Sequence, residues 1–340
     1  MTLAPIIVFA YDRPDHLSQT LGALAKNDLA LQSVLYVYCD GAREWGGDSR
    51  EEKVESQENP KGNYITKRYG KMYCTKEEYE AYLKRIDDVR KLAKLQKGFK
   101  EVHVVEREQN IGLADNIVSA VTEIVNHYGR VIAFEDDIVT TRGCLTYLND
   151  ALELYKDEEQ VMHISAWMYP NKGQFPTTFF YDSPYPAGGW ATWKRAWRHF
   201  NPDTADHVKY WENNWQDFDI EGENHLSKQL LMNLDGTLKT WFIKWYSSMR
   251  RKNGLCLYPG TAMSNNIGWD TTGETSLPET RYNVEHPAEY TKVECIPIVR
   301  NKSVFNYIRV WYSGHWYSKR YRVRFYNKIR RLFGLKPIYG

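Results

Sequence analysis

The 340-residue chain contains little that would place it in or across a membrane. No apolar stretch approaches the roughly 20 residues needed to cross a bilayer. The first apolar run has no basic residues before it and is interrupted early by Asp12, Arg13 and Pro14, which is atypical of a signal peptide. We therefore expect a cytoplasmic protein whose first apolar run is a buried strand.

Cysteine is also scarce, and its spacing is irregular. The five cysteines, at positions 39, 74, 144, 256 and 295, lack the paired spacing that holds structural zinc. An odd, scattered set in a chain without an export signal is typical of reduced thiols. The chain has no evident internal repeat, and it is long enough to bury a sizeable core. These absences favour an ordinary globular protein.

Acidic residues are missing from the last part of the chain. Residues 301–340 contain ten Lys and Arg and no Asp or Glu, whereas residues 1–300 carry a net charge of about −8. Basic and aromatic side chains alternate in this tail, which suits an anionic membrane surface. The tail could also pack on its own domain or, less favoured, bind nucleic acid. A membrane-bound tail would make the protein peripheral on the inner face of the plasma membrane.

The first half of the chain contains a regular alternation of apolar runs and amphipathic segments. Apolar runs at 6–10, 34–38, 101–105 and 131–134 predict strands, while 14–24 and 113–128 have helical spacing. Repeated β-α-β units predict an α/β fold with a mainly parallel central sheet flanked by helices. Ligands of such sheets bind beyond the carboxyl ends of the strands, where Asp12, Asp40, Asn110 and Asp136 fall.

Residues 43–100 interrupt this alternation. The polar stretch 45–73 is typical of a long loop, and 77–96 predicts a surface helix. The residues of its predicted buried face are Tyr79, Leu83, Ile86, Arg90 and Ala93. A long polar segment next to a site is either a mobile lid or an insertion without a role in function. We favour the insertion.

The predicted fourth strand runs directly into Glu135, Asp136 and Asp137. In an extended segment Glu135 and Asp137 project to one side and Asp136 to the other. Carboxylates this close repel one another, and a hard cation such as Mn²⁺ or Mg²⁺ relieves that repulsion, binding one or two carboxylates together with phosphate oxygens. Acidic triplets also occur as helix caps and solvated turns, but the position after a buried strand favours a metal site. Such a metal would neutralise negative charge that builds up on the phosphate oxygens next to it.

Seven short segments carry a resemblance to a known family. They are Pro5-Ile-Ile-Val-Phe-Ala-Tyr-Asp-Arg-Pro, Cys39-Asp-Gly, Arg107-Glu-Gln-Asn-Ile-Gly-Leu-Ala, Phe134-Glu-Asp-Asp, Ile164-Ser-Ala-Trp, Gly188-Gly-Trp and Asn253-Gly-Leu-Cys-Leu-Tyr-Pro. In this order they resemble the GT-A glycosyltransferases, in particular the N-acetylglucosaminyltransferase I-like group and related bacterial polysaccharide (family 2-like) glycosyltransferases. Residues 160–300 are also rich in Trp and Tyr, which form either core or a surface for stacking sugars.

The resemblance implies an activity and a domain organisation. The activity is inverting transfer of a sugar from a nucleotide-diphosphate donor, with a UDP-sugar favoured, to a saccharide or lipid-linked saccharide acceptor in surface polysaccharide biosynthesis. The implied cofactor is Mn²⁺ or Mg²⁺. Residues 1–140 would form the donor half, with 43–100 as the insertion, residues 141–300 the acceptor and catalytic half, and 301–340 the basic tail.

The same resemblance implies roles for individual residues of the donor site. Asp40 would hydrogen-bond the nucleotide base, and Asp137 would be the metal ligand. The other residues expected to contact the donor are Ala10, Tyr11, Arg13, Asn110, Gly112, Leu113, Glu135 and Asp136. Arg107 would face the diphosphate or support the neighbouring loop, or be a surface ion-pair residue. Asp12 could equally cap the first helix.

Gly189 and Trp190 would form the floor where donor sugar and acceptor meet. An inverting transferase also needs a carboxylate that takes the proton from the acceptor hydroxyl. The related bacterial proteins suggest an Asp-Ser-Trp-like segment for it, but this chain has Lys239 at that place, where it would instead steady the diphosphate. The candidates that we retain for the base are Asp217, Glu212 and Asp235, with Asp219 close by. Asp270 is either a turn former or an acceptor-loop residue.

Two other functions compete with this prediction. A sugar nucleotidyltransferase would share the sheet and the metal carboxylate, but it should have a glycine-rich basic loop after the first strand. The chain has Ala10, Tyr11, Asp12, Arg13 and Pro14 there instead. A non-catalytic protein that binds carbohydrate or nucleotide sugar is the other alternative, and the lysine in place of the catalytic acid favours it.

Overall fold

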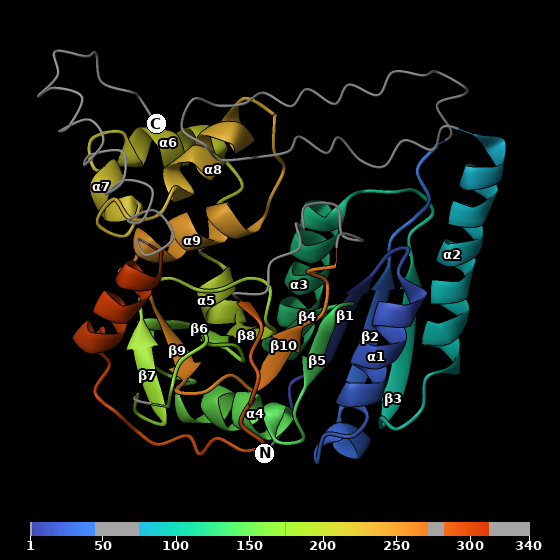
Figure 1. Ribbon diagram of the computed structural model, residues 1–340, viewed down its shortest axis with the longest axis horizontal. Helices are drawn as coiled ribbons and strands as arrows, with labels where there is room; N and C mark the ends of the chain where they lie inside the picture. The colour runs from blue at the N-terminus through green and yellow to red at the C-terminus, as the bar shows by residue number, and fades with distance from the viewer. Residues whose placement is uncertain (1, 45–74, 174, 271–281, 313–340) are drawn as a thin grey trace, which may run out of the picture.

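The computed structural model describes residues 2–44, 75–173, 175–270 and 282–312, and Figure 1 shows how their helices and strands are arranged. The strands are β1 (Ile6–Ala10), β2 (Val34–Cys39), β3 (Glu101–Glu106), β4 (Arg130–Glu135), β5 (Ile138–Thr140), β6 (Val161–Ser165), β7 (Thr178–Tyr181), β8 (Trp190–Trp193), β9 (Leu255–Pro259) and β10 (Ser264–Asn266). Among the described residues, eight of them form one sheet in the order β3-β2-β1-β4-β8-β6-β9-β7, and β5 pairs with β10.

Helices cover this sheet on both faces. They are α1 (Pro14–Leu24), α2 (Lys76–Leu95), α3 (Leu113–Tyr128), α4 (Cys144–Leu154), α5 (Lys194–Trp197), α6 (Thr204–Trp211), α7 (Trp215–Phe218), α8 (Leu226–Leu234) and α9 (Phe242–Arg250), with a 3₁₀ turn at Ala30–Gln32. A further helical segment spans 302–312. In Figure 1, α6 to α9 lie together beyond one end of the sheet strands, and α2 lies at the opposite side of the molecule.

The strands and helices predicted for the first half are confirmed. Strands β1 to β4 run parallel, with β1 between β2 and β4. Strands β8 and β7 are antiparallel to their neighbours, so the sheet is mixed but mainly parallel. Because the carboxyl ends of β1, β2 and β4 meet at one edge, the polar residues that follow them come together there. The predicted α/β class with flanking helices is therefore confirmed.

Helix α2 is present as predicted, but its buried face was placed incorrectly. Thr75 caps the helix and forms a capping box with Glu78. The residues that are buried on it are Tyr82, Ile86, Val89 and Ala93. The predicted face shares only Ile86 and Ala93 with this set, because α2 packs on α1, β2 and β3 along a stripe that includes Tyr82 and leaves Leu83 exposed.

The sheet continues across the boundary expected near residue 140, because β8 pairs with β4 and β6 pairs with β8. The start of the basic tail also belongs to the folded core, since Val304, Phe305 and Ile308 of the helical segment 302–312 are buried. The rest of the tail and the loop predicted at 45–73 lie outside the described residues. Cys39, Cys144, Cys256 and Cys295 are free thiols.

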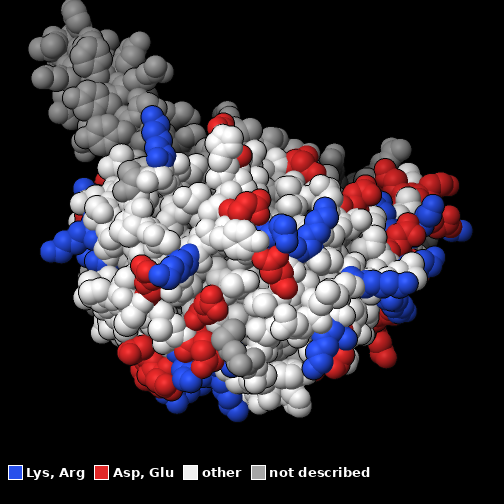
Figure 2. All heavy atoms as spheres, turned by 90° about the horizontal axis from the view of Figure 1, so that it is seen from below, with Lys and Arg blue, Asp and Glu red and all other residues white. Residues whose placement is uncertain are grey.

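Two surface properties bear on the predicted partners. Figure 2 shows acidic and basic side chains interspersed over the face of the described residues that it presents. None of the helices within the described ranges has both the length and the apolar character needed to span a bilayer.

Candidate functional site

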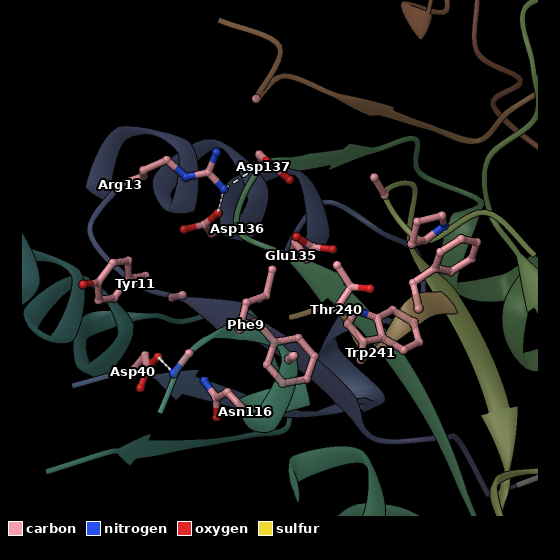
Figure 3. Close-up of a pocket in the computed structure, with 18 of the residues that line it drawn as sticks. Phe9, Tyr11, Arg13, Asp40, Asn116, Glu135, Asp136, Asp137, Thr240 and Trp241 are labelled. Carbon is pink, nitrogen blue, oxygen red and sulfur yellow. Dashed lines mark hydrogen bonds and ion pairs between the residues drawn. The ribbon is translucent and has the colours of Figure 1, made fainter. Parts of the chain in front are cut away.

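A cavity of about 550 Å³ lies at the carboxyl ends of β1, β2 and β4. Its walls come from the end of β1 and the turn after it, the loop into α3, the acidic turn after β4, the segment before α9 and the turn after β10. Figure 3 shows Tyr11 and Asp40 toward one end, Trp241 and Thr240 toward the other, and Glu135 between them. The sequence-predicted residues that line this cavity are Ala10, Tyr11, Arg13, Asp40, Asn110, Gly112, Leu113, Glu135, Asp136 and Asp137.

Asp40 organises the loop that forms the first end of the cavity. Its side chain is buried, and its Oδ1 accepts hydrogen bonds from the backbone N–H groups of Gly41 at 2.8 Å and Ile111 at 3.0 Å. Its Oδ2 accepts from the Asn110 side-chain amide at 3.1 Å and from the Gly112 backbone N–H at 3.0 Å. The loop before α3 is thereby tied to the end of β2.

Helix α2 supports the same end of the cavity. The hydroxyl groups of Tyr11 and Tyr82 lie 2.5 Å apart, and the Arg43 backbone N–H donates to the Tyr82 hydroxyl at 2.7 Å. Burial raises the pKa of the Tyr11 hydroxyl, so this group stays neutral. Arg85 donates to Asp12 at 3.3 Å. Asp12 therefore pairs with α2 and does not cap α1, whose N-cap residue is Arg13.

The acidic triplet follows a different geometry from the one predicted. Strand β4 ends at Glu135, and Asp136 and Asp137 form a turn. One nitrogen of the Arg13 guanidinium donates to both Asp136 and Asp137, the second at 2.9 Å, and Figure 3 draws both contacts. The predicted alternation, with Asp136 pointing away from Asp137, is wrong because the chain turns before the alternation can continue.

The charges of this cluster are only partly balanced. Burial raises the pKa of Glu135 to about 8, and repulsion from Asp137 acts in the same direction. Burial also raises the pKa of Asp136 to about 6, with Arg13 opposing the shift. Asp136 and Asp137 thus share one guanidinium, with the carboxyl group of Glu135 next to them, and a divalent cation would relieve the repulsion within this cluster.

Carboxylate oxygens of this kind suit Mn²⁺ or Mg²⁺ better than softer metals. Within the described ranges, no group of three or more His, Cys, Asp and Glu side chains is arranged to hold a metal. A cation held by Asp136 and Asp137 would therefore need further ligands, and Mg²⁺ commonly takes these from substrate phosphates. The donor set fits such an ion, while metal binding stays a prediction.

The second end of the cavity is aromatic. Trp241 lines it, and its ring stacks on Trp190 with the ring centroids 5.0 Å apart. Trp190 and Gly189 do not reach the cavity, so the prediction that they form its floor is wrong for direct contact. Gly189 packs against Phe134 with a φ of +79°, and a side chain here would collide with that ring. Gly189 and Trp190 therefore pack behind residues of the cavity wall and support them.

Arg107 also lies outside the cavity wall. Its guanidinium donates to Asn116 Oδ1 at 3.3 Å and to the Ser119 hydroxyl at 3.1 Å. Its predicted contact with a diphosphate is therefore not supported by its position, whereas the alternative role in supporting the loop and α3 agrees with these contacts.

None of the predicted candidates for the catalytic base lines the cavity. Asp217 pairs with Arg250 at 2.6 Å, because the buried guanidinium needs a carboxylate next to it. Glu212 ends α6 and Asp235 ends α8, and both are exposed. Asp219 accepts hydrogen bonds from Ser227. These acidic residues serve the packing and ends of α6 to α8.

The carboxylates that do line the cavity all precede residue 138 among the described residues. They are Asp12, Asp40, Glu135, Asp136 and Asp137. Lys239 lines the cavity and pairs with Asp115 on α3, and Asp270 lies 3.1 Å from His16. Further lining residues that the sequence did not single out are Asn116, Gln229, Thr240, Asn266 and Trp269. Of these, only Trp269 carried a signal, as one of the aromatic residues predicted to form either core or a surface for stacking sugars.

Comparison with known proteins gives no matching protein-family model and no matching curated protein. Among solved structures the chain is similar to S. aureus TarS, with 14% identity over 51% of the chain and a TM-score of 0.27. It is similar to the galactosyltransferase LgtC in complex with donor and acceptor sugar analogues, with 13% identity over 62% of the chain and a TM-score of 0.31. A cytidylyltransferase from Leptospira borgpetersenii shares 11% identity over 64% of the chain, with a TM-score of 0.29.

The chain spans 23% of the length of TarS, 65% of LgtC and 74% of the cytidylyltransferase. Both glycosyltransferases and a nucleotidyltransferase occur among these distant neighbours. Overlap at this level does not distinguish their activities, so the function has to be inferred from the cavity.

Proposed function

We propose that this protein is a GT-A-type inverting glycosyltransferase. The donor is a nucleotide-diphosphate sugar, with UDP favoured, and the acceptor is a saccharide or lipid-linked saccharide of a surface polysaccharide. The observation that carries the proposal is the order of groups along the cavity: a polar end with Tyr11 and Asp40, then the acidic turn, which Arg13 contacts, and Glu135, and last an aromatic end with Trp241. This order matches a base, a diphosphate and a sugar.

Each region would contribute a separate function to the transfer. Tyr11 and the loop held by Asp40 bind the base, while Arg13, Arg43 and Lys239 line the cavity with positive charge for the diphosphate. Asp137, together with Asp136, would hold Mn²⁺ or Mg²⁺, which supplies stabilisation of charge on the departing diphosphate.

At the other end of the cavity, the Trp241 ring offers an apolar face against which a sugar can stack. The transfer also requires a group that removes the proton from the acceptor hydroxyl. Within the described residues, no carboxylate from the second half of the chain lines the cavity to do this.

That last observation favours one alternative function. A protein that binds nucleotide sugars without transferring them needs the base pocket and the charged cluster but no acceptor base. The two functions predict different outcomes in one experiment.

The experiment measures donor binding and donor hydrolysis with Mn²⁺ and a panel of nucleotide sugars, with and without saccharide acceptors. Turnover that disappears in Asp137→Ala but persists in Asp235→Asn, which changes an exposed carboxylate outside the cavity, supports the transferase. Binding without turnover under every condition supports the binding protein. If the chain neither binds nor turns over any nucleotide sugar, the proposal is wrong.

A further inference from the structure

We infer that Asn110, and not Asp40, reads the nucleotide base, and that it selects a pyrimidine carrying an N3–H, such as uracil, over cytosine. The inference rests on the proposed function, because it assumes that a nucleotide occupies the cavity. It depends on which acceptor atoms at the polar end of the cavity are already used within the protein.

Asp40 has no acceptor position left for a ligand. A carboxylate has about four lone-pair sites, and four N–H groups already occupy those of Asp40. Three of these donors come from the backbone, where Gly41, Ile111 and Gly112 cannot be satisfied elsewhere without moving the loop. Asp40 is therefore a positioning residue, whose hydrogen bonds fix the chain between β3 and α3.

Asn110 has both of its side-chain donors in use, but its side-chain acceptor is unused. Both hydrogens of its side-chain amide are used, one donated to Asp40 Oδ2 and one to the Gly41 carbonyl oxygen, each at 3.1 Å. The reversed orientation would bring the Asn110 carbonyl oxygen against a carboxylate and a carbonyl, so the network fixes the orientation. The side-chain oxygen of Asn110 then accepts no hydrogen bond from any described residue.

This oxygen belongs to a residue that lines the same cavity as Tyr11 and is hydrogen-bonded to Asp40. Figure 3 places those two residues at the end farthest from Trp241, with Arg13 on the same side as Tyr11 and the acidic turn bound to it on the way toward Glu135. A diphosphate attracted by Arg13 would thus leave the base near Tyr11, whose ring can stack on it. An unused acceptor fixed next to a stacking ring is suited to a donor on the edge of that base.

The chemistry of the two pyrimidines gives the specificity. Uracil presents N3–H, which donates to the Asn110 oxygen, whereas cytosine presents an N3 lone pair that repels it. A site with an oriented polar atom rejects a ligand that leaves this atom unpaired more strongly than an apolar site rejects a change in size. One acceptor that is left unpaired when the base covers it corresponds to a preference of about tenfold or more.

The test is calorimetric titration of UDP and CDP, with Mn²⁺ present, into the wild type and three variants. The wild type should bind UDP about tenfold or more tightly than CDP. Asn110→Ala should bring this ratio close to one. Asp40→Asn should weaken both nucleotides and lower the melting temperature, because the loop moves, and it should also reduce the ratio, because Asp40 no longer orients the Asn110 amide. The ratio is informative even if a variant loosens the loop, since looseness affects both nucleotides.

Asn171→Ala is the matched control. Its amide likewise donates two hydrogen bonds, here to the backbone carbonyls of Tyr169 and Gly260, but it lies outside the cavity, so the ratio should not change. A ratio that survives Asn110→Ala and is lost in Asp40→Asn would overturn the inference and restore Asp40 as the reader. Equal binding of UDP and CDP by the wild type would overturn it while the proposed function stands. Absence of all nucleotide binding would overturn both.

Discussion

Arg13 determines how much negative charge the centre of the cavity presents. Its guanidinium bridges Asp136 and Asp137, the two carboxylates proposed to hold a metal, so the arginine and a cation compete for the same oxygens. Arg13→Gln should therefore bind Mn²⁺ about tenfold more tightly in the absence of nucleotide, since charge-assisted contacts of this kind are worth about 1.5–3 kcal/mol. The same variant should bind UDP more weakly, because the diphosphate loses a cation.

Free Mn²⁺ measured by electron paramagnetic resonance gives the first affinity, and calorimetry gives the second. Arg85→Gln is the control, since Arg85 pairs with Asp12 and does not contact the acidic turn. Weaker Mn²⁺ binding by Arg13→Gln would show that the arginine supports the metal site instead of competing with it.

His163 makes the stability of the protein dependent on pH. Its Nδ1 accepts from Trp245 at 3.2 Å, its Nε2 is buried without a partner among the described residues, and burial lowers its pKa from 6.5 to about 3. Below pH 6.5 the unfolded chain binds a proton that the native state does not, so stability falls as the pH falls from 6.5 toward 3. At pH 5 the loss from this residue is about 2 kcal/mol.

Urea unfolding at pH 7 and pH 5 measures this loss. His163→Gln should flatten the difference between the two pH values, whatever its effect on absolute stability. His103→Gln changes an exposed histidine on β3 and should leave the difference unchanged. An unaltered difference in His163→Gln would mean that other groups cause the acid sensitivity.

Helix α2 was expected to be part of an insertion without a role in function, yet it holds two residues at the cavity. The Tyr82 hydroxyl contacts both the Tyr11 hydroxyl and the Arg43 backbone N–H. Tyr82→Phe should lower UDP affinity about three- to tenfold, as expected for one or two lost hydrogen bonds, with little change in melting temperature.

The matched control is Tyr36→Phe on β2, which removes a solvent-exposed hydroxyl bonded to that of Tyr128 at the end of α3. Calorimetry with UDP and thermal unfolding should be measured on both variants. If Tyr82→Phe melts earlier but binds UDP normally, α2 is only a structural cover.

The elements show which parts of the fold could be predicted. Strands β1 to β4 and helices α1 to α3 follow from local periodicity, because each buries a stripe whose spacing the sequence displays. The pairing of β8 between β4 and β6 could not be predicted, since it depends on contacts between distant segments. The buried face of α2 was predicted only in part for the same reason. The surface against which α2 packs determines that Tyr82 is buried and Leu83 exposed.

The candidate site could also be predicted only in part. Residues placed directly after parallel strands, such as Asp40 and Asp137, were expected to meet, and they line one cavity. Asp217 was a candidate for the catalytic base, and the sequence does not reveal that Arg250 already pairs with it. The exchange of roles between Asp40 and Asn110 was also hidden, because it depends on counting hydrogen-bond donors in the folded loop.

Across the whole molecule, the cavity is where the first and second halves of the chain face each other. Lys239, from the segment before α9, pairs with Asp115 in the first turn of α3, and both side chains are more than half exposed. An exposed ion pair contributes about 0–1 kcal/mol to stability, so this pair is not needed to hold the halves together. Since Lys239 also lines the cavity, Asp115 competes with a diphosphate for its charge.

Two substitutions that each replace one charge of this pair by an uncharged side chain should therefore change UDP affinity in opposite directions. Lys239→Gln should weaken UDP binding severalfold, because the diphosphate loses a cation, and should leave uridine binding unchanged. Asp115→Asn should strengthen UDP binding, because Lys239 is released toward the phosphates. Neither should shift the melting temperature by more than a few degrees, and Lys91→Gln, which breaks an exposed pair with Asp87 on α2, should alter nothing. If both substitutions change UDP affinity in the same direction, the ion pair shapes the cavity as a unit. The two halves of the chain are then held in place by this contact, and the loss of either charge disrupts it.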